Sequence, residues 1–170
     1  LCPQGRGEPP VDASGLPRIP RRKPDAHKGD FGRVLVLAGS PRMTGAAWMS
    51  AQAALRAGAG LVTLGIPARI HPWLASRAAA EMTLPLPDDD EGVFSLDAVE
   101  PALEFLGDCD AFALGPGVGP HAETAAFVRE IALRAGIAGV VDADGLNGLA
   151  GHLDVLRSAA AGRVLTPHPG

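Results

Sequence analysis

One stretch near the start of the chain constrains the fold more than any other. Residues 33–38 read Arg-Val-Leu-Val-Leu-Ala, a short apolar run with a glycine on each side. Such a continuous run is typical of a strand that is buried on both faces. Residues 46–56 contain no glycine or proline and many good helix formers, and residues 61–64 supply a second strand. The stretch therefore predicts a β-α-β unit, whose crossover is right-handed.

The same alternation of strands and helices continues along the chain. Further buried strands are predicted at residues 110–114, 139–141 and 163–166, with an edge strand at 81–86 because Pro85 interrupts it. Helices are predicted at residues 67–80, with Trp73 as a packing residue, at 95–106, with Ser95 as its N-cap, and at 123–135 and 152–161. This order predicts an α/β fold, a mostly parallel, doubly wound sheet with helices on both faces.

The chain divides into two regions. Residues 1–26 contain six prolines among charges and glycines and show no apolar periodicity, so we expect a proline-rich linker or arm. Residues 27–170 carry all the predicted strands and helices. Because the chain starts without Met and stops directly after a strand-like run, we expect the second region to be part of a larger domain.

Composition and charge argue against several classes of function. A formal net charge of -4 gives no basic surface for nucleic acid. No apolar run is long enough to span a bilayer, and the first residues do not read as a signal peptide, so we expect a cytoplasmic protein without a membrane partner. Cys2 and Cys109 lack metal-ligand spacing, which favours two reduced thiols.

The turns after the strands are the candidate binding site, because open α/β sheets bind ligands at the carboxyl ends of their strands. The first turn runs from Gly39 to the helix start. Thr44 is predicted to cap that helix, and the N–H groups of Gly45, Ala46 and Ala47 to form an anion-binding helix start. The alternative is a tight turn that only packs under the helix.

The second turn, residues 115–119, reads Gly-Pro-Gly-Val-Gly. Glycines allow positive φ angles and a close approach of the backbone to a ligand. The turn matches neither the dinucleotide fingerprint G-x-G-x-x-G nor a Walker A loop. By itself it predicts a generic glycine loop.

Two polar turns complete the candidate site. Asp142 and Asp144 follow the fourth buried strand together with Asn147, and such carboxylates can hold Mg²⁺ through water or contact a ribose. An Asx turn that caps the next helix explains them equally well. His168 stands between two prolines that fix its backbone, so it is a candidate substrate contact or a surface turn histidine. The residues alone predict a small-molecule or nucleotide site.

Seven motifs in a fixed order resemble one known family. They occupy residues 27–32, 38–40, 43–46, 56–63, 115–119, 142–147 and 165–170. Together they resemble the ADP- or ATP-dependent NAD(P)H-hydrate dehydratases, the carbohydrate-kinase-like C-terminal domain of the YjeF family. The resemblance implies a ribokinase-like fold, of which residues 27–170 would form the N-terminal part.

The resemblance also implies a reaction, nicotinamide nucleotide repair by a hydro-lyase. (S)-NADHX or NADPHX, hydrated at the nicotinamide ring, would be dehydrated to NADH or NADPH at the expense of ADP or ATP with Mg²⁺. In the family, the added hydroxyl is thought to be phosphorylated and phosphate then lost. The residues expected at the hydrated dinucleotide are Ala47, Gly117 and His168, and those expected near nucleotide or metal are Asp142, Asp144 and Asn147.

The resemblance places the family's catalytic Asp, in a Gly-Asp loop, beyond residue 170. We therefore expect the isolated chain not to turn over, and to form homo-oligomers through exposed apolar surface. In bifunctional members an NAD(P)H-hydrate epimerase domain precedes an arm like residues 1–26. Two alternatives stay open: a kinase of this fold acting on a vitamin precursor or sugar, and a non-catalytic nucleotide-binding chain.

Overall fold

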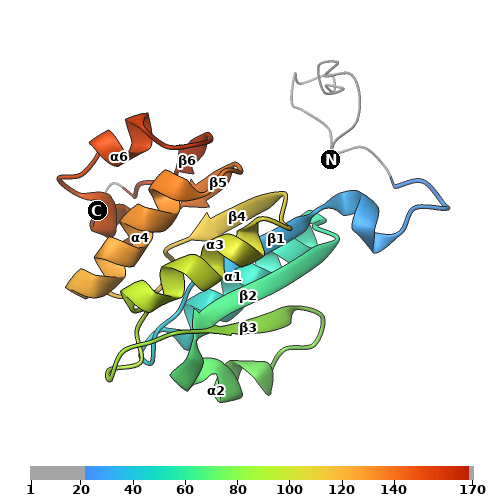
Figure 1. Cartoon of the computed structure of the whole chain (residues 1–170). Coiled ribbons are helices and arrows are strands. Elements are labelled where there is room, and N and C mark those ends of the chain that lie inside the picture. The colour runs from blue at the N-terminus through green and yellow to red at the C-terminus, as the bar shows by residue number, and fades with distance from the viewer. Residues whose placement is uncertain (1–21, 169–170) are drawn as a thin grey trace.

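The computed structural model describes residues 22–168, so most of the predicted arm at 1–26, together with Cys2, lies outside the described residues (Figure 1). Six strands form one parallel sheet in the order β3-β2-β1-β4-β5-β6. The strands are β1 Arg33–Leu37, β2 Leu61–Pro67, β3 Met82–Leu86, β4 Ala111–Leu114, β5 Gly139–Val141 and β6 Arg163–Leu165. The predicted parallel, doubly wound sheet is confirmed, with β3 at its edge.

Helices cover both faces of the sheet, as predicted. They are α1 Thr44–Ala57, α2 His71–Ala75, α3 Val99–Leu106, α4 Ala122–Arg134, α5 Asp144–Leu149 and α6 Asp154–Arg157, with 3₁₀ turns η1 Lys28–Phe31, η2 Ala68–Ile70 and η3 Leu96–Ala98. α1 and α2 pack on one face, where Val36, Leu64 and Leu74 share a buried cluster. α3 and α4 pack on the other face (Figure 1). None of the described helices is long and apolar enough to cross a membrane.

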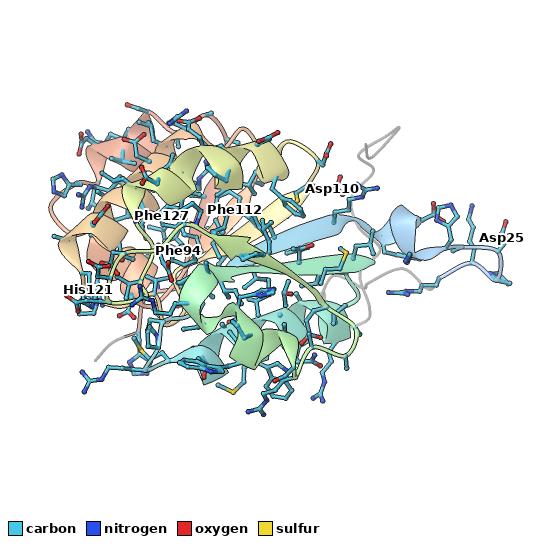
Figure 2. All side chains as sticks on the ribbon, turned by 60° about the horizontal axis from the view of Figure 1, so that its bottom comes forward. Asp25, Phe94, Asp110, Phe112, His121 and Phe127 are labelled. Carbon is cyan, nitrogen blue, oxygen red and sulfur yellow. The ribbon has the colours of Figure 1, made fainter. Side chains whose placement is uncertain are left out.

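Three phenylalanines anchor the layer of α3 and α4 to the sheet. The rings of Phe94 and Phe127 stack with centroids 4.6 Å apart, and Phe112 of β4 lies in the same buried cluster (Figure 2). Burying each such ring contributes about 1.5–3 kcal/mol. This contact fixes α4, and therefore the glycine turn that precedes it, on the sheet.

Two predicted helices are much shorter in the structure. Of residues 67–80, Pro67 ends β2, and only η2 and the five residues of α2 are helical. Of residues 152–161, only the four residues of α6 are helical. Most of the stability of a helix in a protein comes from packing its apolar side chains on the core. Leu153, directly before α6, is 61% exposed and gives no such packing, so the helix does not extend over it.

Two predicted local roles are wrong, and a third is correct in position only. Thr44 is the first residue of α1, not its cap, and no side chain caps that helix. Ser95 occupies the N-cap position of η3, at the start of the predicted helix, but its buried hydroxyl makes no capping hydrogen bond. Trp73 is 57% exposed, because the core-facing positions of η2 and α2 are Ile70 and Leu74.

The order of the strands creates a switch point between β1 and β4. The chain runs outward from β1 through β2 to β3, and later outward from β4 through β5 to β6. Leu37 and Leu114 are register partners at the ends of the two central strands. Ligands of open α/β sheets bind in the crevice at such a point, beyond the carboxyl ends of the strands.

Candidate functional site

The turn after β1 lies against the glycine turn after β4. The Gly39 N–H donates to the Pro116 carbonyl at 2.9 Å, and the Gly115 N–H donates to the Leu37 carbonyl at 3.0 Å. Ala47 is fully buried, and its methyl group lies beneath Gly39. A ligand at this edge therefore meets the backbone at the start of α1 and not the Ala47 side chain.

The glycine turn is more tightly determined than its sequence indicates. Gly115 has a φ of 118°, and a Cβ there would lie 2.2 Å from the Asp142 carbonyl oxygen. Gly117 has a φ of 68°, and a Cβ there would lie 2.8 Å from the Met43 Cβ and 2.9 Å from the Ala46 Cβ. Both positions therefore require glycine, and Gly117 holds the turn against the first residues of α1.

A tight turn links β5 to α5. The Gly145 N–H donates to the Asp142 carbonyl at 2.9 Å, and Ala143 between them has φ 50° and ψ -123°. These angles are those of the first central residue of a type II′ turn, a position that glycine normally occupies. Nothing in the sequence signals this conformation, because alanine rarely adopts it.

The Asp144 carboxylate connects the third turn to the second. One oxygen, Oδ2, accepts the Gly119 N–H at 3.0 Å, and the other, Oδ1, accepts the Asn147 side-chain amide at 3.3 Å. No side chain caps α5. The Asx-turn alternative is therefore wrong for Asp144, whose bond to Gly119 spans the neighbouring loop.

The fourth turn forms a pocket with the third. The Thr166 N–H donates to the Val141 carbonyl at 3.3 Å, which sets the end of β6 beside the end of β5. The pocket between them has a volume of about 380 Å³ and is lined by Asp142, Ala143, Asp144, Leu146, Asn147, Thr166, Pro167 and His168. His168 and the two predicted acidic residues thus face one cavity.

The four turns therefore meet along one edge of the sheet, as predicted. Figure 2 shows Asp110, before β4, and His121, before α4, at opposite ends of the sheet. At the far end, the Arg33 N–H donates to the Asp110 carboxylate at 2.8 Å. The Arg33 N–H holds the pKa of Asp110 below its ordinary value. The same hydrogen bond connects β4 to β1 at the end of the sheet opposite the candidate site.

Within residues 22–168, no three His, Cys, Asp or Glu side chains are grouped so that they could hold a metal ion. Asp144 already uses both oxygens in hydrogen bonds with Gly119 and Asn147. The contacts of Asp144 and the angles of Ala143 are features of this edge that the sequence does not predict.

An open parallel sheet with a glycine turn and a helix start at its switch point defines a doubly wound α/β protein, and solved structures similar to it have the ribokinase-like fold. A ribokinase-like superfamily protein from Enterococcus faecalis V583 has a TM-score of 0.67 at 22% identity, over 87% of this chain and 49% of that one. An ADP/ATP-dependent NAD(P)H-hydrate dehydratase from Bacillus subtilis, co-crystallised with ATP/Mg²⁺, has a TM-score of 0.62 at 24% identity, over 89% and 49%. These similarities support the fold.

The sequence identifies the family within that fold. A family model described as NAD(P)H-hydrate dehydratase matches residues 34–170, and the chain belongs to this family. The bifunctional NAD(P)H-hydrate repair enzyme Nnr of Moorella thermoacetica is 45% identical, over 90% of this chain and 29% of its own length. The ADP-dependent (S)-NAD(P)H-hydrate dehydratase of Xanthomonas campestris is 35% identical, over 94% and 53%. The chain thus spans about a third to a half of these relatives.

Proposed function

We propose that this chain supplies the dinucleotide-binding side of an NAD(P)H-hydrate dehydratase, which restores NADH or NADPH from (S)-NADHX or (S)-NADPHX at the expense of ADP or ATP. One observation carries the proposal. In a chain of this family, the glycine turn and the start of α1 lie at the switch point, and the pocket of His168 lies on the same edge of the sheet, beyond β5 and β6. Binding in that crevice is the general behaviour of such sheets.

Each part of this edge has a chemical role in the proposal. Gly117 lets the backbone of the turn lie against the start of α1, because a side chain there would collide with Met43 and Ala46, and the substrate contacts this backbone. The start of α1 presents the positive end of the helix dipole, which favours the phosphates of a dinucleotide, and Ala47 acts there through its backbone. His168 donates or accepts a hydrogen bond in the pocket that Asp142 and Asn147 also line.

The names of the relatives motivate the choice of nucleotide. One relative is called ADP-dependent, and the Bacillus subtilis structure was obtained with ATP/Mg²⁺. We propose that the ion arrives on the nucleotide phosphates, as Mg²⁺ commonly does.

The wider setting of the chain is also part of the proposal. Residues 27–170 would form the N-terminal part of the dehydratase domain, and residues 1–26 an arm that follows an NAD(P)H-hydrate epimerase domain, as the name of the bifunctional relatives suggests. We place the protein in the cytoplasm, as a homo-oligomer, with the base of the reaction beyond residue 170.

The test is an assay of the complete gene product that contains this chain. Incubation with (S)-NADHX and ADP or ATP should restore the absorbance of reduced nicotinamide. His168→Ala should weaken substrate binding, whereas His152→Ala, an exposed histidine outside the pocket, should not. No recovery of absorbance, or phosphorylation of a vitamin precursor or sugar instead, would contradict the proposal.

A further inference from the structure

The Asp144 carboxylate links the glycine turn to the turn after β5 through a side-chain hydrogen bond. Its Oδ2 accepts the Gly119 N–H at 3.0 Å, across 25 residues of sequence. Its Oδ1 accepts the Asn147 amide at 3.3 Å, which orients the carboxylate from within α5. Two hydrogen bonds thus fix this side chain between two loops.

The glycine turn is held from its other side by β1 and α1. Pro116 accepts the Gly39 N–H at 2.9 Å, and Gly117 packs against Met43 and Ala46. These contacts fix the first half of the turn. The second half, which ends at Gly119, lies against α5 through Asp144.

The position of Asp144 is itself fixed by its backbone. It is the second central residue of the tight turn that the Gly145–Asp142 hydrogen bond closes. That turn cannot move toward the sheet, because the Cα of Gly145 lies against Gly115. The carboxylate therefore reaches Gly119 from a rigid base, beside the pocket that His168 lines.

We infer that Asp144 is a positioning residue, which sets the spacing between the glycine turn and the His168 pocket through hydrogen bonds and not through its charge. The inference rests on the proposed function for its effect on the substrate. A hydrated dinucleotide that spans both parts of the edge binds well only when Gly117 and His168 are held at a fixed separation. Loss of the Asp144 bond leaves both groups present but misplaced.

Exchanging Asp144 and Asn147 provides a direct test, in the complete gene product. Asp144→Asn keeps an acceptor for Gly119, and the exposed Asn147 amide can turn so that its oxygen accepts from the new NH₂ group, so KM for (S)-NADHX should stay within about twofold of the wild-type value. The double exchange, Asp144→Asn with Asn147→Asp, also leaves one acceptor and one donor between the two positions. KM should again lie within about twofold of the wild-type value.

Removal of the carboxylate gives the size of the effect. Asp144→Ala should raise KM about tenfold and change kcat by less than about threefold, since a lost positioning bond weakens binding more than chemistry. Asp154→Asn, an exposed acid in α6, is the matched control and should change neither. A fall in kcat of about a hundredfold that the double exchange does not rescue would overturn the inference, because the charge itself would then be required.

A second measurement does not depend on activity. Amide hydrogen exchange at Gly119 should become about tenfold faster in Asp144→Ala and recover in the double exchange, with circular dichroism confirming that each variant is folded. Unchanged exchange would refute the positioning role even in an active enzyme. If the wild-type protein does not restore NADH, the proposed function fails, while faster exchange at Gly119 would still support the role of Asp144 in holding the turn.

Discussion

Replacing Ala143 with glycine should stabilise the protein, although glycine substitutions usually destabilise. Ala143 has φ 50° and ψ -123°, which L-residues with a side chain rarely adopt. A strained residue of this kind costs about 1–3 kcal/mol. Its methyl group is exposed, so its removal loses little apolar burial.

The opposing effect is the greater freedom of glycine in the unfolded chain, about 0.4–1 kcal/mol. The difference gives an expected stabilisation of about 0.5–2 kcal/mol for Ala143→Gly. Ala150→Gly is the matched control, because Ala150 is also exposed but has the ordinary angles φ -57° and ψ 127°. It should destabilise by about 0.4–1 kcal/mol.

Urea unfolding of the two variants and the wild type, followed by far-ultraviolet circular dichroism, separates the two effects. A change of 1 kcal/mol moves the midpoint by about 0.3–1 M urea at an unchanged slope. The midpoint should rise for Ala143→Gly and fall for Ala150→Gly. If both variants lose the same stability, Ala143 is not strained and the type II′ turn described above is incorrect.

Three further predictions concern the site, the far end of the sheet and its edge. Gly117→Ala should raise KM for the hydrated dinucleotide and lower stability by about 2 kcal/mol, because its methyl group would collide with Met43 and Ala46; wild-type kinetics and unfolding would contradict this. Asp110→Asn should lower stability by about 0.5–1 kcal/mol at neutral pH. Since the Arg33 N–H lowers the pKa of Asp110, its contribution is complete above pH ~4 and disappears on further acidification, so the urea midpoints of variant and wild type should converge at low pH. The isolated 170-residue chain should associate, because Val164 of β6 is 60% exposed, and Val164→Lys should reduce the mass found by light scattering.

The strands of this protein are readable from its sequence, and the reason is burial. Strands such as β1 and β4 lie inside the sheet under helices, so their apolar runs stand out against glycine and charge on either side. Pro85 predicts that β3 is an edge strand, because proline has no N–H to donate to a neighbouring strand on each side. The helices predicted at residues 67–80 and 152–161 are too long, because these segments have a helix-forming composition but few side chains that reach the core.

The candidate site was predictable as a location but not as a set of contacts. Turns at the carboxyl ends of parallel strands must share an edge, so grouping Gly117, Asp144 and His168 required only the strand assignment. The burial of the Ala47 methyl group depends on how α1 sits on β1, which the sequence does not state. The bond between Asp144 and Gly119 depends on two loops 25 residues apart, and no local pattern encodes it.

The switch point also has a consequence for folding. Strands β1, β2 and β3 form one half of the sheet, and β4, β5 and β6 form the other. The β1–β4 ladder is the strand pairing that joins the two halves. Each half thus consists of contacts that are close in sequence, whereas the seam joins the halves through a single parallel ladder. Because Gly117 meets α1 across that seam, the binding edge exists only after the halves have docked. We therefore expect ligand affinity to emerge last during refolding, later than helical circular dichroism.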